Sequence, residues 1–387
     1  SMSESTSVNN LHQLEYGWLP TEEPEPENVD GQSPRYSITG GKKTISLRIE
    51  KIGKVEAAVG VDWCQGFVRG QIRNVEQFLG DFEGLSEEAE REGIANFVFR
   101  GHPASYKPGG LGIKGYCRFP HKVDLDGGRI VLAAVDPREV AANLKNLVGF
   151  IQIKGSGCMG LSGLQVLDKM QTLADGFGLH DAEVHPSRVD YFVDLFGLSI
   201  DHMVEMLETG ALLSRLSKER TSREFKNATG IELGNRSGDA VFVRIYDKLA
   251  ELSKPGNEVK LELYKAANPN WDGGPVTRVE FECKRNYLKA RYSVRKLIEL
   301  RVMSPHIIVD LMNGAARVVD PESATRNARK QTSQWWKELA MGFSNEFVSA
   351  EDGVGLSPDP VFDPKTCLLS IGGMVSAIAA NMFDGDM

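Results

Sequence analysis

Two stretches decide how this chain folds: RVDYFVDL at 188–195 and TRVEFECK at 277–284. In both, charged and apolar side chains alternate, which is the pattern of a β-strand with one buried face. The charged face of the first stretch carries Arg188, Asp190 and Asp194, and that of the second carries Arg278, Glu280, Glu282 and Lys284. A third stretch, AVFVRIYDK at 240–248, places Arg244, Tyr246 and Lys248 on one face. We therefore predict three strands that each have one polar face.

The rest of the sequence predicts a mixture of strands and helices. Strands are expected at 44–51, 55–68, 97–101, 116–124, 129–135 and 148–154, and helices at 72–93, 137–146, 161–177 and 199–209, with a mainly helical region at 286–342 that is broken at Ser304-Pro305. No series of parallel βαβ units is evident. Strands that follow one another in hairpin-like pairs favour an α+β fold with a central, largely antiparallel sheet flanked by helices.

The net charge of −8 over 387 residues conceals an uneven distribution. Seven acidic and no basic residues fall within 1–34, and seven acidic residues with one Lys fall within 346–387. The middle of the chain is therefore mildly basic, and the total charge does not argue against a nucleic-acid partner. Five Cys without a Cys-x-x-Cys pair argue against a disulfide scaffold and a Cys-rich zinc site. With no signal peptide and no membrane span evident, we expect a cytoplasmic protein.

The polar faces of the three strands suggest a site for phosphate chemistry. A solvated outer face is the ordinary explanation for any one alternating strand. If the three strands are neighbours, however, their carboxylates form an acidic cluster surrounded by Arg and Lys. Mg²⁺ and Mn²⁺ prefer oxygen ligands of this kind, and the surrounding cations would hold phosphates. Together these groups would make a metal-dependent phosphoryl-transfer site.

Two basic segments suggest contact with DNA. The segment 284–296, KRNYLKARYSVRK, has no acidic residue and six basic ones, namely Lys284, Arg285, Lys289, Arg291, Arg295 and Lys296. The segment 214–226 adds Arg215, Lys218, Arg220 and Arg223. A basic helix that also carries Tyr287 and Tyr292 suits binding to the DNA backbone and could supply a Tyr nucleophile. The alternative is a solvated helix whose Tyr side chains pack against the sheet.

The remaining motifs are weaker. Gly155, Gly157 and Gly160 match a dinucleotide-binding fingerprint, which leaves a nicotinamide-dependent oxidoreductase open. A tight turn between a strand and a helix explains the same glycines without a cofactor. There is no Walker A motif for ATP, and the seven His show no His-x-His spacing.

Read in order, the motifs resemble the Rep_trans-type rolling-circle replication initiators of plasmids, filamentous phages and related mobile elements. The matching pieces are VDW at 61–63, GSGCMGL at 155–161, SRVDYFVDLFG at 187–197, ELGNRSGDAVFVRIYDKLAE at 232–251, TRVEFECKR at 277–285 and SQWW at 333–336. The resemblance covers about 60–340 and makes the Gly155 motif a turn. It implies the sheet of the HUH nucleases or of RRM domains without the His-x-His motif, in a protein that binds its replication origin and nicks one strand.

Composition predicts a disordered acidic segment at 1–40 and an acidic, loosely structured tail at 346–387, with a helical part at 303–345 before it. To the rest of the chain the resemblance gives roles, namely a DNA-binding α+β part at 41–155 and a catalytic nicking part at 156–302. The implied partners are origin DNA (a single-stranded or hairpin nick site) and the host helicase and polymerase, with a homodimer as a further expectation.

In the implied reaction a Tyr attacks a DNA phosphodiester and leaves a 5′-phosphotyrosine and a free 3′-OH. A divalent metal, Mg²⁺ or Mn²⁺, would polarise the phosphate. Its expected ligands are Asp190 and Glu280, followed by Asp194 and Glu282. Phosphate-binding or orienting roles are expected for Arg188, Arg244, Lys248 and Arg278. Tyr246 and Asp247 are expected to be structural or to support the ligands.

The nucleophile is the point at which the sequence departs from the family pattern. The position that the pattern gives is Ala290. Tyr287 is favoured because it lies close to the same face of the helix, and Tyr292 is the second choice. This departure leaves open a different nucleophile, or an origin-binding protein that recruits helicase without cleaving. A conjugative relaxase, which has the same chemistry in a different genetic setting, is a further alternative.

Overall fold

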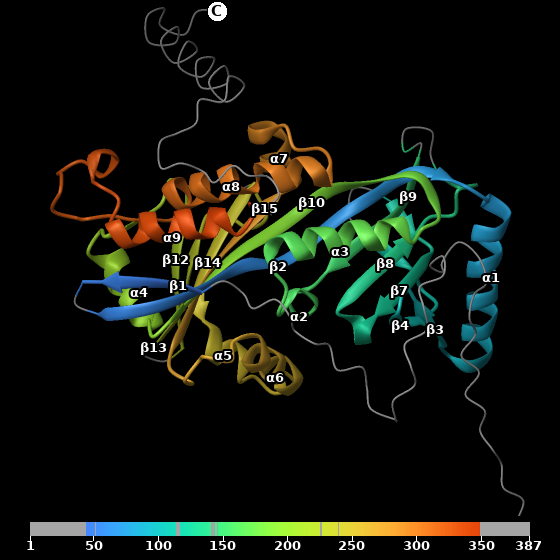
Figure 1. Cartoon of the computed structure of the whole chain (residues 1–387), viewed down its shortest axis with the longest axis horizontal. Coiled ribbons are helices and arrows are strands. Elements are labelled where there is room, and N and C mark those ends of the chain that lie inside the picture. The colour runs from blue at the N-terminus through green and yellow to red at the C-terminus, as the bar shows by residue number, and fades with distance from the viewer. Residues whose placement is uncertain are drawn as a thin grey trace, which may run out of the picture. The chain divides into compact units, whose positions relative to one another are not determined.

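The computed structural model describes residues 44–50, 52–113, 117–140, 144, 146–224, 227–238 and 240–348. A sheet of twelve strands dominates this part of the chain, and each of its pairings is antiparallel (Figure 1). From edge to edge its strands are β12 (Glu219–Glu224), β13 (Asn227–Leu233), β14 (Val241–Asp247), β15 (Val276–Lys284), β10 (Leu179–Phe196), β2 (Gly53–Ile72), β9 (Leu147–Ile153), β8 (Ile130–Ala134), β7 (His121–Leu125), β4 (His102–Tyr106) and β3 (Ala95–Phe99), with β1 (Thr44–Ile49) paired to β2. The predicted α+β class with an antiparallel sheet is confirmed.

Two long strands join the halves of the sheet. β2 has 20 residues and β10 has 18, and they pair along most of their length. Strands from the predicted DNA-binding part, 41–155, and from the predicted catalytic part, 156–302, therefore belong to the same sheet. The different roles of these two parts stay predictions.

Apolar helices cover one face of the sheet. They are α3 (Gly163–Asp175), α8 (Leu297–Gly314) and α9 (Gln334–Asn345), with α7 (Arg285–Tyr292) beside α8 (Figure 1). The apolar side chains of β10 and β15 point into this layer. The Tyr191 hydroxyl shares a hydrogen bond of 2.8 Å with Ser304 Oγ, and its ring packs edge-on against Phe343. α3 begins at a capping box in which Ser162 and Gln165 bond to each other's backbone N–H. The core of the protein lies between these helices and the sheet.

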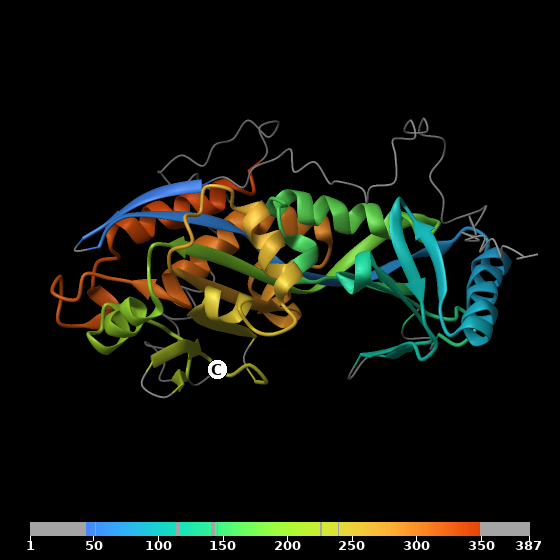
Figure 2. The ribbon, with the colours of Figure 1, turned by 90° about the horizontal axis from the view of Figure 1, so that it is seen from below.

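The opposite face of the sheet is polar along β14, β15 and β10, whereas over β2, β8 and β9 it carries a second, smaller apolar cluster that includes Phe67 and Phe150. The short helices α2 (Gly155–Cys158) and α5 (Lys248–Leu252), together with α6 (Glu258–Ala267), lie on this side (Figure 1, Figure 2). The other elements are α1 (Val75–Glu92), α4 (Ile200–Glu208), the small pairs β5 (Leu111–Ile113) with β6 (Cys117–Phe119) and β11 (Leu212–Leu213) with β16 (Arg317–Val318), and 3-10 turns at Asp126–Gly128 and Asn327–Arg329.

One expectation about the C-terminal region was wrong. The predicted break at Ser304-Pro305 does not occur, because α8 continues through Pro305 and Ser304 Oγ bonds back to the Leu300 carbonyl at 2.7 Å. The predicted boundary at 302/303 therefore falls inside a continuous helix. Phe347 is buried against Tyr191, so packing against the sheet continues to this residue, and the tail predicted from 346 onward stays a prediction.

Some expectations fall where the structure gives no description. The predicted acidic segment 1–40, residues 141–143 and 145 of the predicted helix 137–146, and the predicted tail from 349 onward lie outside the described residues. The described start of that predicted helix, 137–139, is a turn instead. No helix among those described is long and apolar enough to cross a membrane.

Candidate nucleic-acid site

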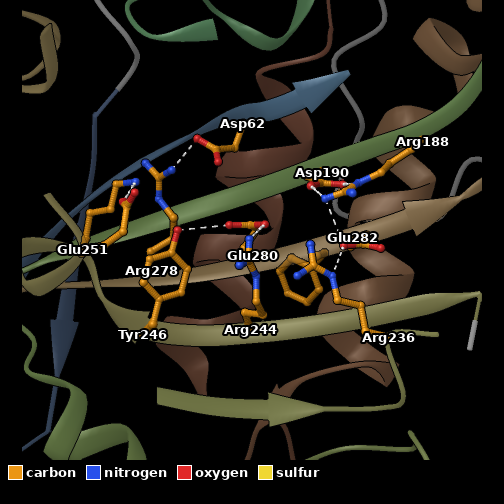
Figure 3. Close-up of polar contacts among 12 residues, drawn as sticks. Asp62, Arg188, Asp190, Arg236, Arg244, Tyr246, Glu251, Arg278, Glu280 and Glu282 are labelled. Atoms are coloured by element: carbon orange, nitrogen blue, oxygen red, sulfur yellow. Dashed lines mark hydrogen bonds and ion pairs between the residues drawn. The ribbon is translucent and has the colours of Figure 1, made fainter. Parts of the chain in front are cut away.

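The three strands with polar faces are neighbours in the sheet, in the order β14, β15, β10. Their register places Arg244 opposite Glu280 and Asp194 opposite Arg278, which are pairs of opposite charge, and it places two carboxylates, Asp190 and Glu282, opposite each other. Directly opposite residues on an antiparallel pair share one face of the sheet. The predicted gathering of carboxylates and cations is therefore real, and it lies on the polar face (Figure 3).

At one end of this array, Arg188 holds two buried carboxylates together. Its guanidinium donates to Asp190 at 2.8 and 2.5 Å and lies 3.0 Å from Glu282, which also accepts from Arg236 at 3.1 Å. Burial raises the pKa of Asp190 to about 7, with a contribution from Glu280 and Glu282, although Arg188 opposes the shift. Asp190 therefore exchanges its proton near neutral pH.

In the middle of the array, Glu280 accepts from two side chains of β14. Arg244 donates to its Oε1, and the Tyr246 hydroxyl donates to its Oε2 at 3.1 Å. Burial lowers the pKa of Arg244, but the charge of Glu280 outweighs this and raises it, so the guanidinium stays charged. Arg244 Nε is buried and has no hydrogen-bond partner among the described residues. Burial and Glu280 keep the Tyr246 phenol protonated by raising its pKa, although Arg278 opposes them.

At the other end, buried Arg278 links two carboxylates. It donates to Asp194 at 2.6 and 2.7 Å and to Asp62 at 2.5 Å, and Asp194 also accepts from Tyr264 at 2.9 Å. Burial raises the pKa of Asp62, but the charges of Arg278, Lys248 and nearby lysines outweigh it, so that pKa lies well below its usual range.

Asp62 is a site residue that the sequence analysis missed. It lies in the VDW segment of β2, at a shift in register where Asp190 pairs with Trp63 but Tyr191 pairs with Val61. The extra residue forms a β-bulge, and bulges redirect side chains. Regular alternation along β2 would place the adjacent residues Asp62 and Trp63 on opposite faces, so it could not predict that both lie at the site. The resemblance of the VDW segment to the family motif was the one available signal.

A pocket of about 890 Å³ opens over this array. It is lined by seven basic residues: Lys154, Arg188, Arg236, Arg244, Lys248, Lys254 and Lys260. The rings of Trp63 and Tyr246 also line it. Gly155 lies against Asp62: a Cβ atom added to Gly155 would be only 3.2 Å from the Asp62 carboxylate oxygens. Lys248 is buried beside Glu251 at 2.5 Å, and burial lowers its pKa.

The carboxylates do not form the predicted metal centre in this arrangement. In the described part of the chain no three His, Cys, Asp or Glu side chains come together in a way that could hold a metal ion. Each of Asp190, Glu280, Asp194 and Glu282 is paired with an Arg instead. A divalent cation at any of them would have to displace a guanidinium, so this donor set does not fit the ion as it stands.

The predicted nucleophiles are not part of the pocket. Tyr287 packs against the apolar core, and its hydroxyl lies 3.1 Å from that of Tyr292, which donates to Asp310 of α8 at 2.7 Å. Burial raises the pKa of Tyr287 to about 12. Because α8 covers the apolar face, both Tyr side chains lie on the opposite side of the sheet from Glu280 and Arg278. The structure therefore separates the predicted nucleophiles from the predicted phosphate-binding groups.

The predicted DNA-binding residues fall into two groups. On and around α7, Lys289 and Arg295 are exposed, while Arg291 pairs with Asp310 and Lys296 pairs with Glu183; Lys284 and Arg285 are half-buried. Near the edge strand β12, Arg215, Lys218 and Arg220 are exposed, and the side chain of Arg223 is not among those described. The two groups are separate surfaces.

Comparison with known proteins gives remote likeness to solved structures alone. No protein-family model matches the chain, and no curated protein sequence matches it. A solved structure, described as a rolling circle replication initiator protein from Geobacillus stearothermophilus, is 17% identical with a TM-score of 0.43, and the match covers 74% of this chain and 97% of that one.

Proposed function

We propose that this protein is a replication initiator of the rolling-circle type, which binds its origin and nicks one DNA strand. The observation that carries the proposal is the pocket, in which cations from several strands and helices meet two aromatic rings over a fixed array of carboxylates. The motifs that resemble the Rep_trans-type initiators agree with it, since their segments at 61–63, 155–161, 187–197, 232–251 and 277–285 all contribute to this face.

The pocket suits a single DNA strand. Lys and Arg neutralise phosphates, and every base has a flat face that stacks on an aromatic ring. Arg188 already lies over the ring of Trp63, with its guanidinium carbon 5.1 Å from the ring centroid. The carboxylates hold the guanidinium groups in place before the strand binds, so little side-chain entropy is lost when phosphates arrive.

The reaction would be a transesterification. A Tyr hydroxyl of this chain replaces the 3′ oxygen at the scissile phosphate, which gives a 5′-phosphotyrosine and a 3′-OH that a host polymerase extends after helicase unwinds the duplex. The fixed guanidinium groups stabilise the charge that develops on the phosphate oxygens. The use of Mg²⁺ or Mn²⁺ and a homodimer stay predictions, and no step here depends on them.

A second candidate is an origin-binding protein that recruits helicase without cleaving DNA. It is favoured by one observation, the separation of Tyr287 and Tyr292 from the pocket. A conjugative relaxase would share the nicking chemistry and would differ in the DNA on which it acts.

The test uses the full chain and end-labelled oligonucleotides that tile the DNA around its own gene, as single strands and as hairpins. A band shifted on a denaturing gel, formed with one strand only, is expected for the nicking initiator. Specific binding without such a band supports the non-cleaving protein. No binding to any of these DNAs contradicts both.

A matched pair of lysines tests whether the pocket is where DNA binds. Lys254 and Lys265 are both exposed, and of the two Lys254 alone lines the pocket. Lys254→Ala should weaken binding to single-stranded DNA and reduce the slope of log affinity against log salt by about 0.7. Lys265→Ala should leave both unchanged. Equal effects of the two variants would place the DNA elsewhere.

A further inference from the structure

The nucleophile of the proposed nicking reaction should lie in the pocket that holds the strand. Among the described tyrosines, Tyr246 is the one that lines this pocket. Tyr264 is buried beneath it on Asp194, Tyr191 is buried on the apolar face, and Tyr287 and Tyr292 lie with α8. We propose that Tyr246 is the nucleophile and that Glu280 is the base that accepts its proton. This inference rests on the nicking function proposed above.

Tyr246 and Glu280 already form a nucleophile and base pair. The phenol donates to Glu280 Oε2 at 3.1 Å, within the range expected for such a pair before substrate binds. Arg244 holds the other oxygen, Oε1, so the orientation of the carboxylate is fixed. A hydroxyl, a base and a group that orients the base together make the pattern of an activated nucleophile.

The side chain of Tyr246 is surrounded by positive charge. Its ring centroid lies 5.5 Å from the guanidinium carbon of Arg244 and 5.8 Å from the ammonium of Lys248. Arg278 occupies the position opposite Tyr246 on β15. A phosphodiester that approached the phenol in the pocket would meet Arg244 and Lys248, which offset the charge on its oxygens in the transition state, while Arg278 lies buried behind them on Asp194 and Asp62. Arg244 Nε, buried without a described partner, is one donor that a bound phosphate could engage.

The step is balanced in atoms and protons. The Tyr246 oxygen forms a bond to phosphorus, and the bond between phosphorus and the 3′ oxygen breaks. The phenol proton passes to Glu280, and the 3′ oxygen takes up one proton from water in the open pocket, so that the products are a phosphotyrosine ester, a 3′-OH, a protonated Glu280 and a hydroxide ion, and the last two neutralise each other to restore the carboxylate. Because burial keeps the phenol protonated near neutral pH, the base is required.

This inference corrects the structural role expected for Tyr246. Tyr287 and Tyr292 then serve to hold α7 on α8. Their rings pack edge-on with centroids 5.4 Å apart, the Tyr287 hydroxyl bonds to the Tyr292 hydroxyl, and the Tyr292 hydroxyl donates to Asp310 of α8. Neither is a pocket-lining residue.

The experiment maps the covalent adduct on the wild-type chain, so it does not depend on a variant that folds. Trypsin cleaves after Lys and Arg, and it separates the three candidates because Tyr246 falls in 245–248, Tyr287 in 286–289 and Tyr292 in 292–295. Mass analysis after nuclease trimming is expected to find the nucleotide on 245–248. An adduct on 286–289 or 292–295 would overturn the inference but keep the proposed nicking function.

Variants give an independent readout. Tyr246→Phe should abolish the adduct while origin binding persists, and the Tyr287→Phe, Tyr292→Phe double variant should retain it. Glu280→Gln should slow adduct formation about 10²- to 10⁴-fold while origin binding persists. Normal adduct formation by Tyr246→Phe would overturn the inference. If the wild-type chain bound the origin but formed no covalent adduct, both the inference and the proposed nicking function would be wrong.

Discussion

Asp194→Asn should destabilise the protein strongly, because Asp194 balances a buried charge. The side chain of Asp194 is fully buried and takes two hydrogen bonds from Arg278 and one from Tyr264. Asparagine keeps the size but not the charge. Removing one member of a buried ion pair costs about 3–5 kcal/mol. Asp62 still contacts the guanidinium, so we expect the lower end of that range, about 3 kcal/mol.

Urea unfolding measures this cost as a lower midpoint with an unchanged slope. An exposed pair, Lys265 with Glu262 at 2.9 Å, provides the control: Glu262→Gln should cost about 1 kcal/mol or less. The cost of Asp194→Asn combined with Arg278→Met should fall short of the sum of the single variants by roughly 1–3 kcal/mol, since the two share one interaction. A loss below about 1 kcal/mol for Asp194→Asn, or strict additivity, would refute the view that this pair is a buried charge pair.

Three further predictions test other parts of the structure. The raised pKa of Asp190 means that the folded protein holds a proton that the unfolded chain releases, so stability should fall as pH rises from about 4 to 7. In thermal melts, Asp190→Asn should make this fall with pH less steep. An unchanged pH dependence would show that Asp190 is ionised throughout. If the α7 surface contacts the duplex backbone, Lys289→Ala with Arg295→Ala should weaken binding to all duplex sequences alike and reduce the salt slope by about 2, measured by fluorescence anisotropy at several salt concentrations, whereas a loss confined to one sequence would point to base contacts. Gly163→Ala should lower the melting temperature, because the added Cβ would lie 2.2 Å from the ring of Phe347, and a melting temperature equal to that of the wild type would mean that this ring does not pack on α3.

Local pattern was enough to predict the strands that build the site. The alternation in 188–195, 240–248 and 277–284 predicted which side chains share a face, and the sheet confirms each strand. The polar face also follows from the sequence, since period-two alternation leaves no other arrangement once one side is buried. The predicted helix at 161–177 is α3 within two residues at each end.

Local sequence pattern could not predict which side chains the carboxylates contact. Apart from Arg188, which holds Asp190 from the same strand, their partners come from other strands and loops: Arg236 reaches Glu282 across 46 residues of sequence, and Arg278 reaches Asp62 across 216. Pairing of this kind depends on strand order and register. The sequence therefore indicated carboxylates suited to a metal, whereas the fold pairs each of them with a guanidinium.

The sequence by itself determined the strands, their polar faces and the basic character of α7, because each depends on neighbours a few residues apart. Only the tertiary structure decided which Tyr faces the pocket. α7 begins directly after β15, and its amphipathic pattern does not say on which face of the sheet it will pack; it packs on α8, away from Glu280. A bulge in β2 turned Asp62 and Trp63 to the same face against the period of the strand. Both outcomes depend on contacts between segments far apart in the chain, which a local pattern does not contain.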